Sequence, residues 1–567
     1  MERLTVAGAA SRRTPLAVAA LATLFAAWLY GWRVIDPTST AWLLHGDPAQ
    51  HYLGSVFFLG EPWHWPPGLI TRFGEQPTSV VFTDAIPLVV LLAKLLQVPP
   101  GTQYFGLWMV LCHALSAWWG VQLLRRMGLT HPLALAGGGL VLATAPALLF
   151  RAYGHEALMG HFLVIAALER MLAPWRSWPW LALAAVAVLV HPYLALMVCV
   201  LAAASGLAAW KEGAIGSARL FVLGGGWGLL LAGEAWLAGY FAGSGEISAA
   251  GHRWFTANLL TWFDPMSWKA FMAWKASLAG DTVVLEPVRE WSRWLPGLKQ
   301  AQVGQYEGFA YFGAGALLAA AVAVGAAASG RAAPPTATRT RWTAAIVAAL
   351  FFALWSLSAR PTLGGVVLAD IPLGSLGERI VGVFRASGRF IWPATYLAMA
   401  WALATAGRLR WGVGLLVLVL VVQQADLFYK YKEFRIRFRS GPADIEQPTA
   451  DPVWQQALVR CPRLEMVSGP QPKGKWVAAA LAAGRAEASF YPAPTARYSP
   501  EAAAARQETV KKLIGENGWR RDVVYMLVSP LPDGVPVEKV ATALPAGMRH
   551  VRADGYDLAV PDACLGR

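Results

Sequence analysis

Charged residues are scarce in this sequence. Only 14% of its 567 residues are Asp, Glu, Lys or Arg, whereas 56% are hydrophobic, and a soluble protein carries about a quarter charged residues. Apolar runs of about 20 residues recur along the chain, and this is the length that a helix needs to cross a bilayer. The composition therefore excludes a string of ordinary soluble domains and predicts a membrane protein that is mainly α-helical.

Cysteine is also rare, and its spacing excludes a zinc site. The four Cys form no CxxC pair and no cluster with His, so the usual ligand pattern for zinc is missing. Cys112 and Cys199 lie in apolar runs, which indicates inert packing residues. Cys461 and Cys564 lie in the polar tail and could form a disulfide if that tail is in an oxidising compartment.

Nucleotide-binding glycine motifs and internal repeats are missing as well. The net charge of +14 could suggest a nucleic-acid partner. However, most basic residues stand in short clusters beside apolar runs, where they are typical determinants of membrane topology. We therefore expect membrane lipids, and no nucleic acid, as partners of the basic residues.

The apolar runs predict a polytopic bundle of about eleven transmembrane helices. The first run has no small-residue cleavage site and is long for a signal peptide, so we expect a first transmembrane helix there. His191-Pro192 divides one long run into two helices. The run 85–98 is too short to span and contains Lys94, which predicts a helix lying in the outer interface. The predicted spans are 15–33, 104–124, 132–150, 157–173, 179–190, 193–210, 218–241, 308–328, 342–358, 390–406 and 411–428.

The distribution of basic residues predicts which ends of these spans face the cytoplasm, because Lys and Arg are enriched in cytoplasmic loops. With a cytoplasmic N-terminus, Arg151 is the only basic residue in the short outer loops. The long segments 34–103, 242–307 and 359–389, together with the tail, then lie on the periplasmic side of a bacterial inner membrane. The predicted inner positions carry Arg3, Arg12, Arg13, Arg125, Arg126, Arg170, Arg176, Lys211, Arg219, Arg331, Arg339, Arg341, Arg408 and Arg410.

The tail changes character and predicts a small periplasmic α/β domain, 429–567, after a transmembrane domain, 1–428. Its first segment, YKYKEFRIRFR at 429–439, is basic where the topology expects few basic residues. The strict alternation of this segment favours a strand. The rest of the tail predicts strands at 463–467, 523–528 and 550–560, and helices at 475–487 and from Ser499-Pro500 to 518.

The first outer loop contains HGDPAQHYLG at 45–54, which places His45, Asp47 and His51 within seven positions. A carboxylate here could act as a general base on a hydroxyl group. The same residues also match a helix start, in which Asp47 caps the helix and Gln50 closes a capping box. Asp84, later in this loop, is either the cap of the interfacial helix or a second acid over the same cavity.

Two further outer segments carry ionisable groups next to hydrocarbon, where such groups are costly and tend to mark function. The sequence RAYGHEALMGHF at 151–162 contains Arg151, His155 and Glu156. The sequence GQYEGFAYFG at 304–313 contains Glu307 at the start of a predicted span. The alternative for both acids is an ordinary helix start.

The segment FRASGRFIWPATY at 384–396 places Arg385 and Arg389 at the outer end of a span, against the usual charge bias. A pair of guanidinium groups can hold a phosphate through two parallel hydrogen bonds. Snorkelling toward lipid headgroups is the alternative. The segment 242–307 is rich in Trp and Phe with Lys269 and Lys275 between them, which predicts an interfacial amphipathic helix.

Taken together, these features resemble the GT-C superfamily of integral-membrane glycosyltransferases. The likeness covers 1–428 and consists of an acid after the first span, an interfacial helix opening at Thr83-Asp84-Ala85-Ile86-Pro87, a polar patch after the third span and a soluble domain after the last. The sequence is most similar to a bacterial branch with the signatures GDPAQHY, QYEGFAYFG and SGRFIWP.

This resemblance implies a glycosyltransferase that moves a sugar from a polyprenyl-phosphate-linked donor to a cell-envelope glycan or lipid acceptor in the periplasm. Asp47 matches the superfamily's first-loop acid and is the expected base, whereas Asp84 matches only loosely. No clear DxD motif is present, so the expectation is an enzyme with no metal ion and no other cofactor. The substrate-binding candidates are His45, His51, Asp84, Arg151, His155, Glu156, Glu307, Arg385 and Arg389.

Two other functions compete with transfer. A transporter or flippase for a lipid-linked glycan usually shows repeat symmetry and charged sites within the membrane, and here Glu234 is the main acid within a predicted span. A membrane scaffold whose α/β tail binds an envelope partner is the third possibility. An outer cavity without a carboxylate placed to act as a base would favour the scaffold.

Overall fold

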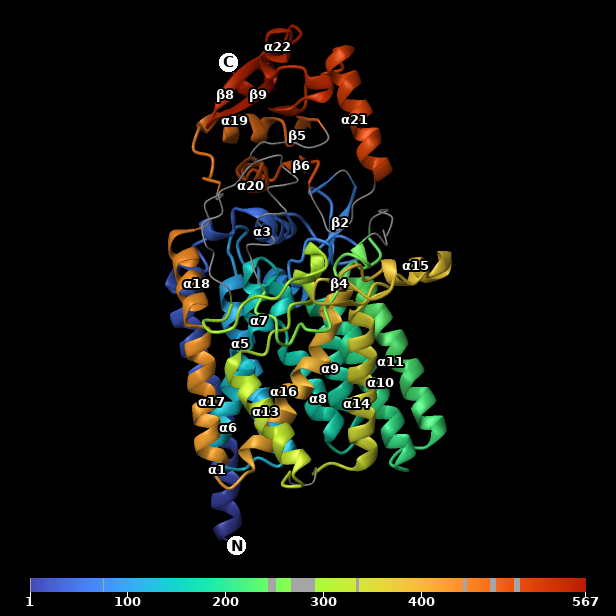
Figure 1. The fold of residues 1–567 in the computed structure, drawn as a ribbon. Helices are drawn as coiled ribbons and strands as arrows, with labels where there is room; N and C mark the ends of the chain where they lie inside the picture. Colours follow the sequence, from blue (N-terminus) through green and yellow to red (C-terminus); the bar gives the residue numbers. More distant parts are fainter. Residues whose placement is uncertain are drawn as a thin grey trace. The chain divides into compact units, whose positions relative to one another are not determined.

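The computed structural model is mainly helical, with a small sheet near the C-terminus (Figure 1). It divides into two compact units, each assembled from separate stretches of sequence. The helical unit comprises Met1–Ile35, Phe105–Leu231 and Ser248–Ser440, and the mixed unit comprises Asp36–Tyr104, Ala232–Ile247 and Gly441–Arg567. The structure describes residues 2–74, 76–242, 251–266, 291–332, 336–441, 446–469, 476–493 and 500–566.

Long helices, joined by short turns, make up the helical unit. Prolines start many of them, because the missing N–H of proline costs nothing in the first turn of a helix. The helices are α1 (Glu2–Tyr30), α2 (Trp32–Ile35), α5 (Phe105–Arg126), α6 (Pro132–Ala143), α7 (Pro146–Phe150), α8 (Phe162–Leu172), α9 (Ser177–Val190), α10 (Pro192–Lys211), α11 (Ser217–Ala238), α13 (Ala314–Ala328), α14 (Arg339–Ser356), α15 (Gly374–Gly382), α16 (Trp392–Gly407), α17 (Gly412–Asp426) and α18 (Phe428–Ser440).

Short 3-10 turns and a hairpin complete the described part of this unit. The turns are η2 (Arg151–Tyr153), η3 (Glu156–Met159), η5 (Val303–Gly308) and η6 (Ser387–Ile391), and the hairpin pairs β3 (Thr362–Leu363) with β4 (Val366–Val367). Helix α5 packs against α1, α6 and α8, while α13 packs against α16 and α17. In Figure 1 most of these helices run side by side.

Five helical segments in the described part of the chain are long and apolar enough to cross a membrane. A sixth is α17 with α18, if this pair, bent by 51°, counts as one span. The remaining predicted spans fall on shorter helices, such as α8 with 11 residues and α16 with 16, or on α14. The expected break at His191-Pro192 is confirmed. The five segments are Arg13–Tyr30, Phe105–Arg126, Pro132–Tyr153, Pro192–Lys211 and Ser217–Ala238.

The predicted strand at 429–439 is wrong, because this segment is the helix α18. Its buried residues Lys430, Phe434 and Phe438 follow the spacing of one helical face. Ile436, which a strand would place on the same face as Phe434, is 65% exposed. The apolar residues at 434 and 438 satisfy both periods, so the alternation alone could not separate helix from strand.

The aromatic segment 242–307 does not form the predicted amphipathic helix where it is described. Trp254 and Trp262 lie in turns of residues 251–266. The indole N–H of Trp262 donates to the Thr395 hydroxyl at 3.0 Å. Trp268, Lys269, Phe271, Trp274 and Lys275 lie outside the described residues.

The mixed unit joins the first loop to the C-terminal tail. This differs from a division at residue 428, because 36–104 group with the tail and not with the helices. From the first loop come η1 (Ala41–Leu43), α3 (Gly46–Gly60), β1 (Leu69–Ile70), β2 (Thr78–Ser79) and α4 (Pro87–Leu95). From the tail come α19 (Pro452–Arg460), β5 (Arg463–Ser468), α20 (Val477–Arg485), β6 (Ser489–Tyr491), α21 (Pro500–Gly515), β7 (Val524–Val528), η7 (Pro532–Gly534), α22 (Val537–Thr542), β8 (Met548–Ala553), β9 (Tyr556–Pro561) and α23 (Asp562–Leu565).

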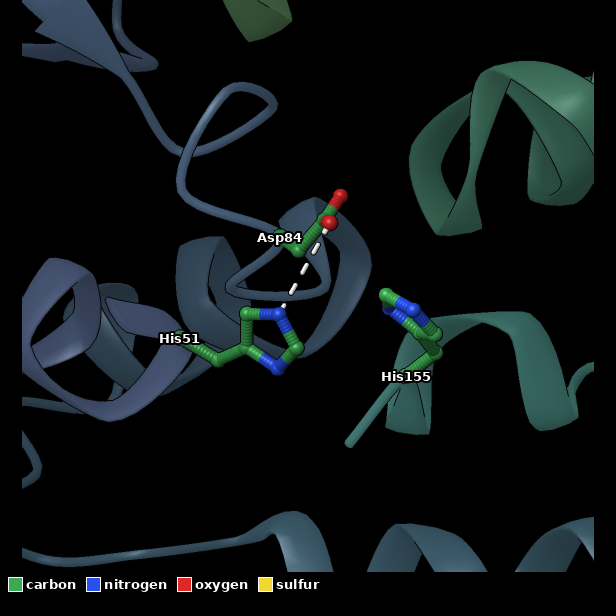
Figure 2. A group of neighbouring side chains, drawn as sticks. All are labelled: His51, Asp84 and His155. Carbon is green, nitrogen blue, oxygen red and sulfur yellow. Dashed lines mark ion pairs between the residues drawn. The ribbon is translucent and has the colours of Figure 1, made fainter. Parts of the chain in front are cut away.

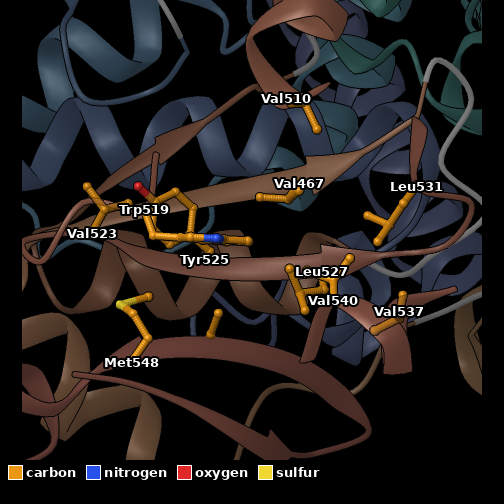
Figure 3. Close-up of a cluster of buried hydrophobic side chains, with 11 residues drawn as sticks. Val467, Val510, Trp519, Val523, Tyr525, Leu527, Leu531, Val537, Val540 and Met548 are labelled. Atoms are coloured by element: carbon orange, nitrogen blue, oxygen red, sulfur yellow. The ribbon is translucent and has the colours of Figure 1, made fainter. Parts of the chain in front are cut away.

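The tail contains a five-stranded sheet in the order β6-β5-β7-β9-β8. The first three of these strands are parallel, and β9 and β8 add antiparallel pairs. A cluster that includes Val467, Trp519, Tyr525 and Leu527 fills the core beside the sheet (Figure 3). The predicted strands at 463–467 and 523–528 and the two predicted helices are confirmed. The predicted strand at 550–560 is instead the β8–β9 hairpin, turned at Asp554-Gly555 with positive φ at both residues.

The first loop pairs with the edge of this sheet. The Phe490 N–H donates to the Arg72 carbonyl at 2.9 Å, and the Gly74 N–H donates to the Phe490 carbonyl at 3.0 Å. The edge strand β6 is thereby covered, which removes the unpaired backbone groups that an open edge exposes. On α20, a Cβ at Gly484 would lie 2.9 Å from the Val56 side chain of α3. The first loop is therefore part of the tail's fold.

Helix α4 confirms the predicted helix in the run 85–98. Its Lys94 is buried, and the ammonium group donates to the Phe58 carbonyl of α3 at 2.6 Å. Burial lowers the pKa of Lys94 to about 8, and the Glu61 carboxylate opposes this shift. Lys94 therefore fastens α4 to α3 instead of extending into solvent.

The tail is closed by a disulfide between Cys461 and Cys564, a pairing that the sequence left open. The bridge spans 103 residues of sequence and joins the end of α19 to α23. Disulfides form and persist in oxidising compartments. The free thiols Cys112 and Cys199 lie on α5 and α10.

Loss of this disulfide should destabilise the tail. For the full-length chain in detergent, we expect Cys461→Ala to lower the free energy of unfolding of the tail by about 2–5 kcal/mol, because a long loop is released in the unfolded state. Urea unfolding followed by limited proteolysis of the tail measures the effect. Cys199→Ala is the control and should leave the tail unchanged. Equal protease resistance with and without a reductant would contradict this role.

Candidate functional site

A buried ion cluster lies within the helical unit, centred on Glu307. The Arg151 guanidinium donates to the Glu307 carboxylate at 2.7 Å and to the Glu307 backbone carbonyl at 2.8 Å. Arg389 binds the same carboxylate in a bidentate manner, with its Nε and Nη2 atoms at 2.9 and 2.8 Å. The His155 Nε2 atom lies 3.9 Å from the carboxylate. Three candidates from two separate segments, 151–155 and 389, therefore meet at one acid.

Aromatic rings enclose both guanidinium groups. The Arg389 guanidinium lies 4.8 Å from the centre of the Tyr193 ring, and the Arg151 guanidinium lies 5.2 Å from the Trp392 ring. Arg151 is completely buried. Cation–π contacts of this kind strengthen when water is excluded. The Tyr193 hydroxyl in turn accepts a hydrogen bond from the Ala386 N–H at 2.8 Å, three residues before Arg389.

Glycine explains how the backbone brings these side chains together. Glu307 and Arg389 stand in the turns η5 and η6, each next to a glycine. A Cβ at Gly388 would lie 2.7 Å from the Gly308 Cα atom, so only glycine permits this approach. The Gly388 N–H also donates to the Phe255 carbonyl at 2.8 Å. The segments 307–309 (EGF) and 387–389 (SGR) therefore contact each other through their glycines.

The cluster holds Glu307 in its ionised form. Burial would raise the pKa of the Glu307 carboxyl, but the Arg389 and Arg151 guanidinium groups together lower it well below its ordinary range. Among the described residues, two guanidinium groups share this one carboxylate. The Arg151 Nε atom is buried and has no hydrogen-bond partner in the described part of the chain. The site is therefore suited to an additional anion.

The other candidates of this unit have different surroundings. Glu156 is fully buried in η3, and its backbone carbonyl accepts a hydrogen bond from Trp108 at 2.8 Å. Arg385 is exposed and lies 6.0 Å from the Phe255 ring. No interaction is seen between Arg385 and Glu307 within the described residues. Of the two arginines in FRASGRF, only Arg389 therefore belongs to the ion cluster.

A second polar group lies within the mixed unit, where His51 of α3 faces Asp84 (Figure 2). The His51 Nε2 atom is 3.7 Å from an Asp84 carboxylate oxygen, and the His51 side chain is almost fully buried. Gly54 makes this approach possible, because a Cβ there would lie 2.3 Å from the Thr83 side chain. Helix α3 is thereby pressed against the turn that carries Asp84.

The alternative prediction that Asp47 caps a helix and Gln50 closes a capping box is wrong. Helix α3 begins at Gly46 with His45 at the cap position, and no side chain caps it. Gln50 donates to the Phe82 carbonyl at 3.3 Å instead of closing a capping box. Asp47 is exposed in the first turn, where a negative charge is favourable. His45 is buried.

Asp84 does not cap the interfacial helix either. The cap position of α4 is Ile86, which has φ of 55°, and Asp84 has φ of 52°. Asp tolerates this left-handed conformation, but a β-branched residue such as Ile rarely adopts it. The Tyr104 hydroxyl donates to the carbonyl of Ala85 between them. Asp84 is therefore directed at His51 by a constrained turn.

Within the described part of the mixed unit, the His51–Asp84 pair is smaller than a structural zinc site. His51 and Asp84 offer two ligand atoms within the mixed unit, and structural zinc usually takes four. In the cluster of the helical unit, two cations already occupy Glu307. The sequence did not point to Tyr193 and Trp392, whose rings cover the two guanidinium groups. The only feature that marks them in the sequence is that each is an aromatic residue next to a proline.

Comparison with protein families identifies the chain. Residues 19–428 match the family model described as a domain of unknown function, DUF6311, and residues 453–561 match the DUF6311 C-terminal domain. The chain belongs to the DUF6311 family. No curated protein matches its sequence.

Removal of the central carboxylate should destabilise the helical unit. Glu307→Gln leaves two buried guanidinium groups without their counter-charge, so we expect a loss of about 3–5 kcal/mol at neutral pH. Because the pKa of Glu307 is lowered in the fold, its contribution is present above the ordinary pKa and is lost as the pH falls through the folded value. The wild type should therefore lose stability on acidification below pH ~4 through this group, and the variant should lack this component.

Thermal unfolding of the purified protein in detergent at several pH values, followed by tryptophan fluorescence, measures both effects. Glu378→Gln is the matched control, because Glu378 pairs with Arg253 at a half-exposed position in the same unit, where a pair contributes at most about 1 kcal/mol. Equal losses for the two variants would refute the central role of Glu307.

The glycine contact gives a separate prediction. Gly388→Ala should push η6 away from Gly308, loosen the bond between Arg389 and Glu307, and cost about 1–3 kcal/mol of stability. Gly325→Ala is the control, because a Cβ at Gly325 meets no atom within 4 Å. The comparison uses melting temperature at pH 7. A Gly388→Ala protein as stable as the Gly325→Ala protein would rule out the close contact.

Proposed function

We propose that this member of the DUF6311 family is a membrane glycosyltransferase of the GT-C type, which uses a polyprenyl-phosphate-linked sugar donor. The observation that carries the proposal is the pair of guanidinium groups, Arg151 and Arg389, that share the Glu307 carboxylate. Cations in a mainly apolar helical unit are costly and tend to mark function. A lipid-linked phosphate is an anion that guanidinium groups bind well.

In this proposal, Arg151 and Arg389 stabilise the departing phosphate. Negative charge grows on the leaving phosphate as its bond to the anomeric carbon breaks. Because Glu307 already orients both guanidinium groups, little reorganisation is needed when this charge develops. His155 is 28% exposed beside the same carboxylate, so it could donate a further hydrogen bond to a phosphate oxygen.

Asp47 is the proposed general base. Its carboxylate is exposed in the first turn of α3, whereas the His51–Asp84 pair one turn later is largely buried. In the reaction, Asp47 takes the proton of an acceptor hydroxyl, and that oxygen forms the new bond to the anomeric carbon. The bond between this carbon and the phosphate oxygen breaks, and the electron pair leaves with the polyprenyl phosphate. The His51–Asp84 pair positions α3 and its first turn.

The proposal includes a multi-pass location in a bacterial inner membrane, with about eleven crossings, a cytoplasmic N-terminus and a periplasmic tail. The asymmetry of basic residues supports this topology. The disulfide of the tail agrees with a periplasmic side, because cytoplasmic thiols are kept reduced. The acceptor would be a glycan or lipid of the cell envelope. Metal-independent transfer follows from the missing DxD motif.

Transport of a lipid-linked glycan is the competing function. Its main support is Glu234, an acid within the apolar helix α11. Transport and transfer differ in a simple respect, because only transfer breaks the bond between sugar and phosphate. An assay for release of polyprenyl phosphate therefore separates them.

Replacement of the proposed base should abolish most of the transfer activity. In membranes supplied with labelled polyprenyl-phosphate sugars and an envelope extract as acceptor, Asp47→Asn should lower the rate of transfer about 10²–10⁴-fold. Asp36→Asn is the matched control, because Asp36 also precedes a proline in the first loop but bonds Thr38. Full activity of Asp47→Asn would exclude Asp47 as the base.

A further inference from the structure

Helix α15 has one strongly apolar and exposed face. Leu376, Ile380 and Val383 are 71%, 54% and 54% exposed. Their spacing of four and three residues places them on one side of a helix. The hairpin β3–β4 and the residues that follow it also carry exposed apolar side chains. These are Leu363, Val366, Leu368 and Ile371.

The opposite side of α15 is fastened to the helical unit by Arg253. This guanidinium donates to the Glu378 carboxylate at 3.1 Å and to the Ile371 carbonyl at 3.0 Å, and it also binds Asp370. Glu378 stands about half a turn away from the face of Leu376 and Ile380. These bonds fix the rotation of α15, so its apolar face is held outward.

Two arginines accompany the apolar face. Arg379 lies in the last turn of α15, and Arg385 follows three residues after its end. Both are exposed, and neither forms an ion pair with a carboxylate within the described residues. An exposed apolar face flanked by free guanidinium groups is typical of helices that lie on anionic membranes.

The position of α15 favours a lipid surface over a protein partner. The chain reaches it from α14, whose exposed Ile346, Leu350 and Leu354 present an apolar surface suited to lipid, and continues into α16. Figure 1 shows α15 extending sideways from the bundle, across the direction of α14. A transverse amphipathic helix at the end of a bundle is the arrangement expected at the headgroup layer.

We propose that α15, with Arg379 and Arg385, is a binding surface for anionic phospholipid headgroups. The apolar face of Leu376, Ile380 and Val383 enters the boundary between headgroups and acyl chains, and the two guanidinium groups bind phosphate oxygens. This surface is separate from the Glu307 cluster and does not depend on the proposed transfer reaction. It would anchor the segment that leads directly into η6.

Site-directed fluorescence in nanodiscs tests this surface on the full-length chain. A bimane label is placed at Leu376→Cys or, as control, at Ser375→Cys, both in a Cys199→Ala background. Phosphatidylcholine with a nitroxide near the top of the acyl chain should quench the label at 376 roughly threefold more than the label at 375. Equal quenching of the two labels would overturn insertion of the apolar face.

The headgroup contacts are tested with the same label at 376 and nitroxide on phosphatidylglycerol or phosphatidylcholine. We expect nitroxide-labelled phosphatidylglycerol to quench the label more strongly than nitroxide-labelled phosphatidylcholine. In the double variant Arg379→Gln/Arg385→Gln, this preference for phosphatidylglycerol should fall about fivefold for each arginine lost. Arg331→Gln/Arg339→Gln is the control with the same loss of charge elsewhere in the helical unit. An unchanged preference in the first variant, or shielding of the label by a second protein molecule, would overturn the proposal.

Discussion

The bond between the Glu307 carboxylate and two guanidinium groups is the interaction on which the candidate site depends. Arg151, Glu307 and Arg389 come from three separate turns, and none of these turns is long enough to hold a charged side chain in place alone. Truncation of one partner of such a cluster is strongly unfavourable, whereas the intact cluster adds little net stability. Stability alone therefore does not explain a cluster of this kind in an apolar environment.

The same constraint shapes the surrounding sequence. Gly308 and Gly388 must lack side chains because their backbones touch, and Tyr193 and Trp392 cover the guanidinium groups. In the mixed unit, Gly54 plays the equivalent part by bringing His51 to Asp84. In both units a glycine permits the close approach of two segments, and an ionisable residue near that glycine pairs across the contact.

Local signals explain what the sequence could predict. Apolar runs and prolines located many of the helices, and the positions of Cys461 and Cys564 in a polar tail made a disulfide possible without deciding it. Arg151, Glu307 and Arg389 could each be recognised as candidates, because charge next to hydrocarbon is costly. Their contact with one another could not be predicted, since no sequence periodicity links turns so far apart. Residues 429–439 were misassigned because their apolar positions satisfy both periods. The cap predicted at Asp84 failed because the chain turns through left-handed residues there.

The proposed transfer reaction requires a lipid-linked phosphate beside the Glu307 cluster. A structure of the full-length chain in a nanodisc with a polyprenyl-phosphate analogue is the most direct measurement. The account predicts density for the phosphate within hydrogen-bond distance of Arg389, Arg151 or His155, with Glu307 still bound to both arginines. An analogue bound with its phosphate away from all three residues would contradict it.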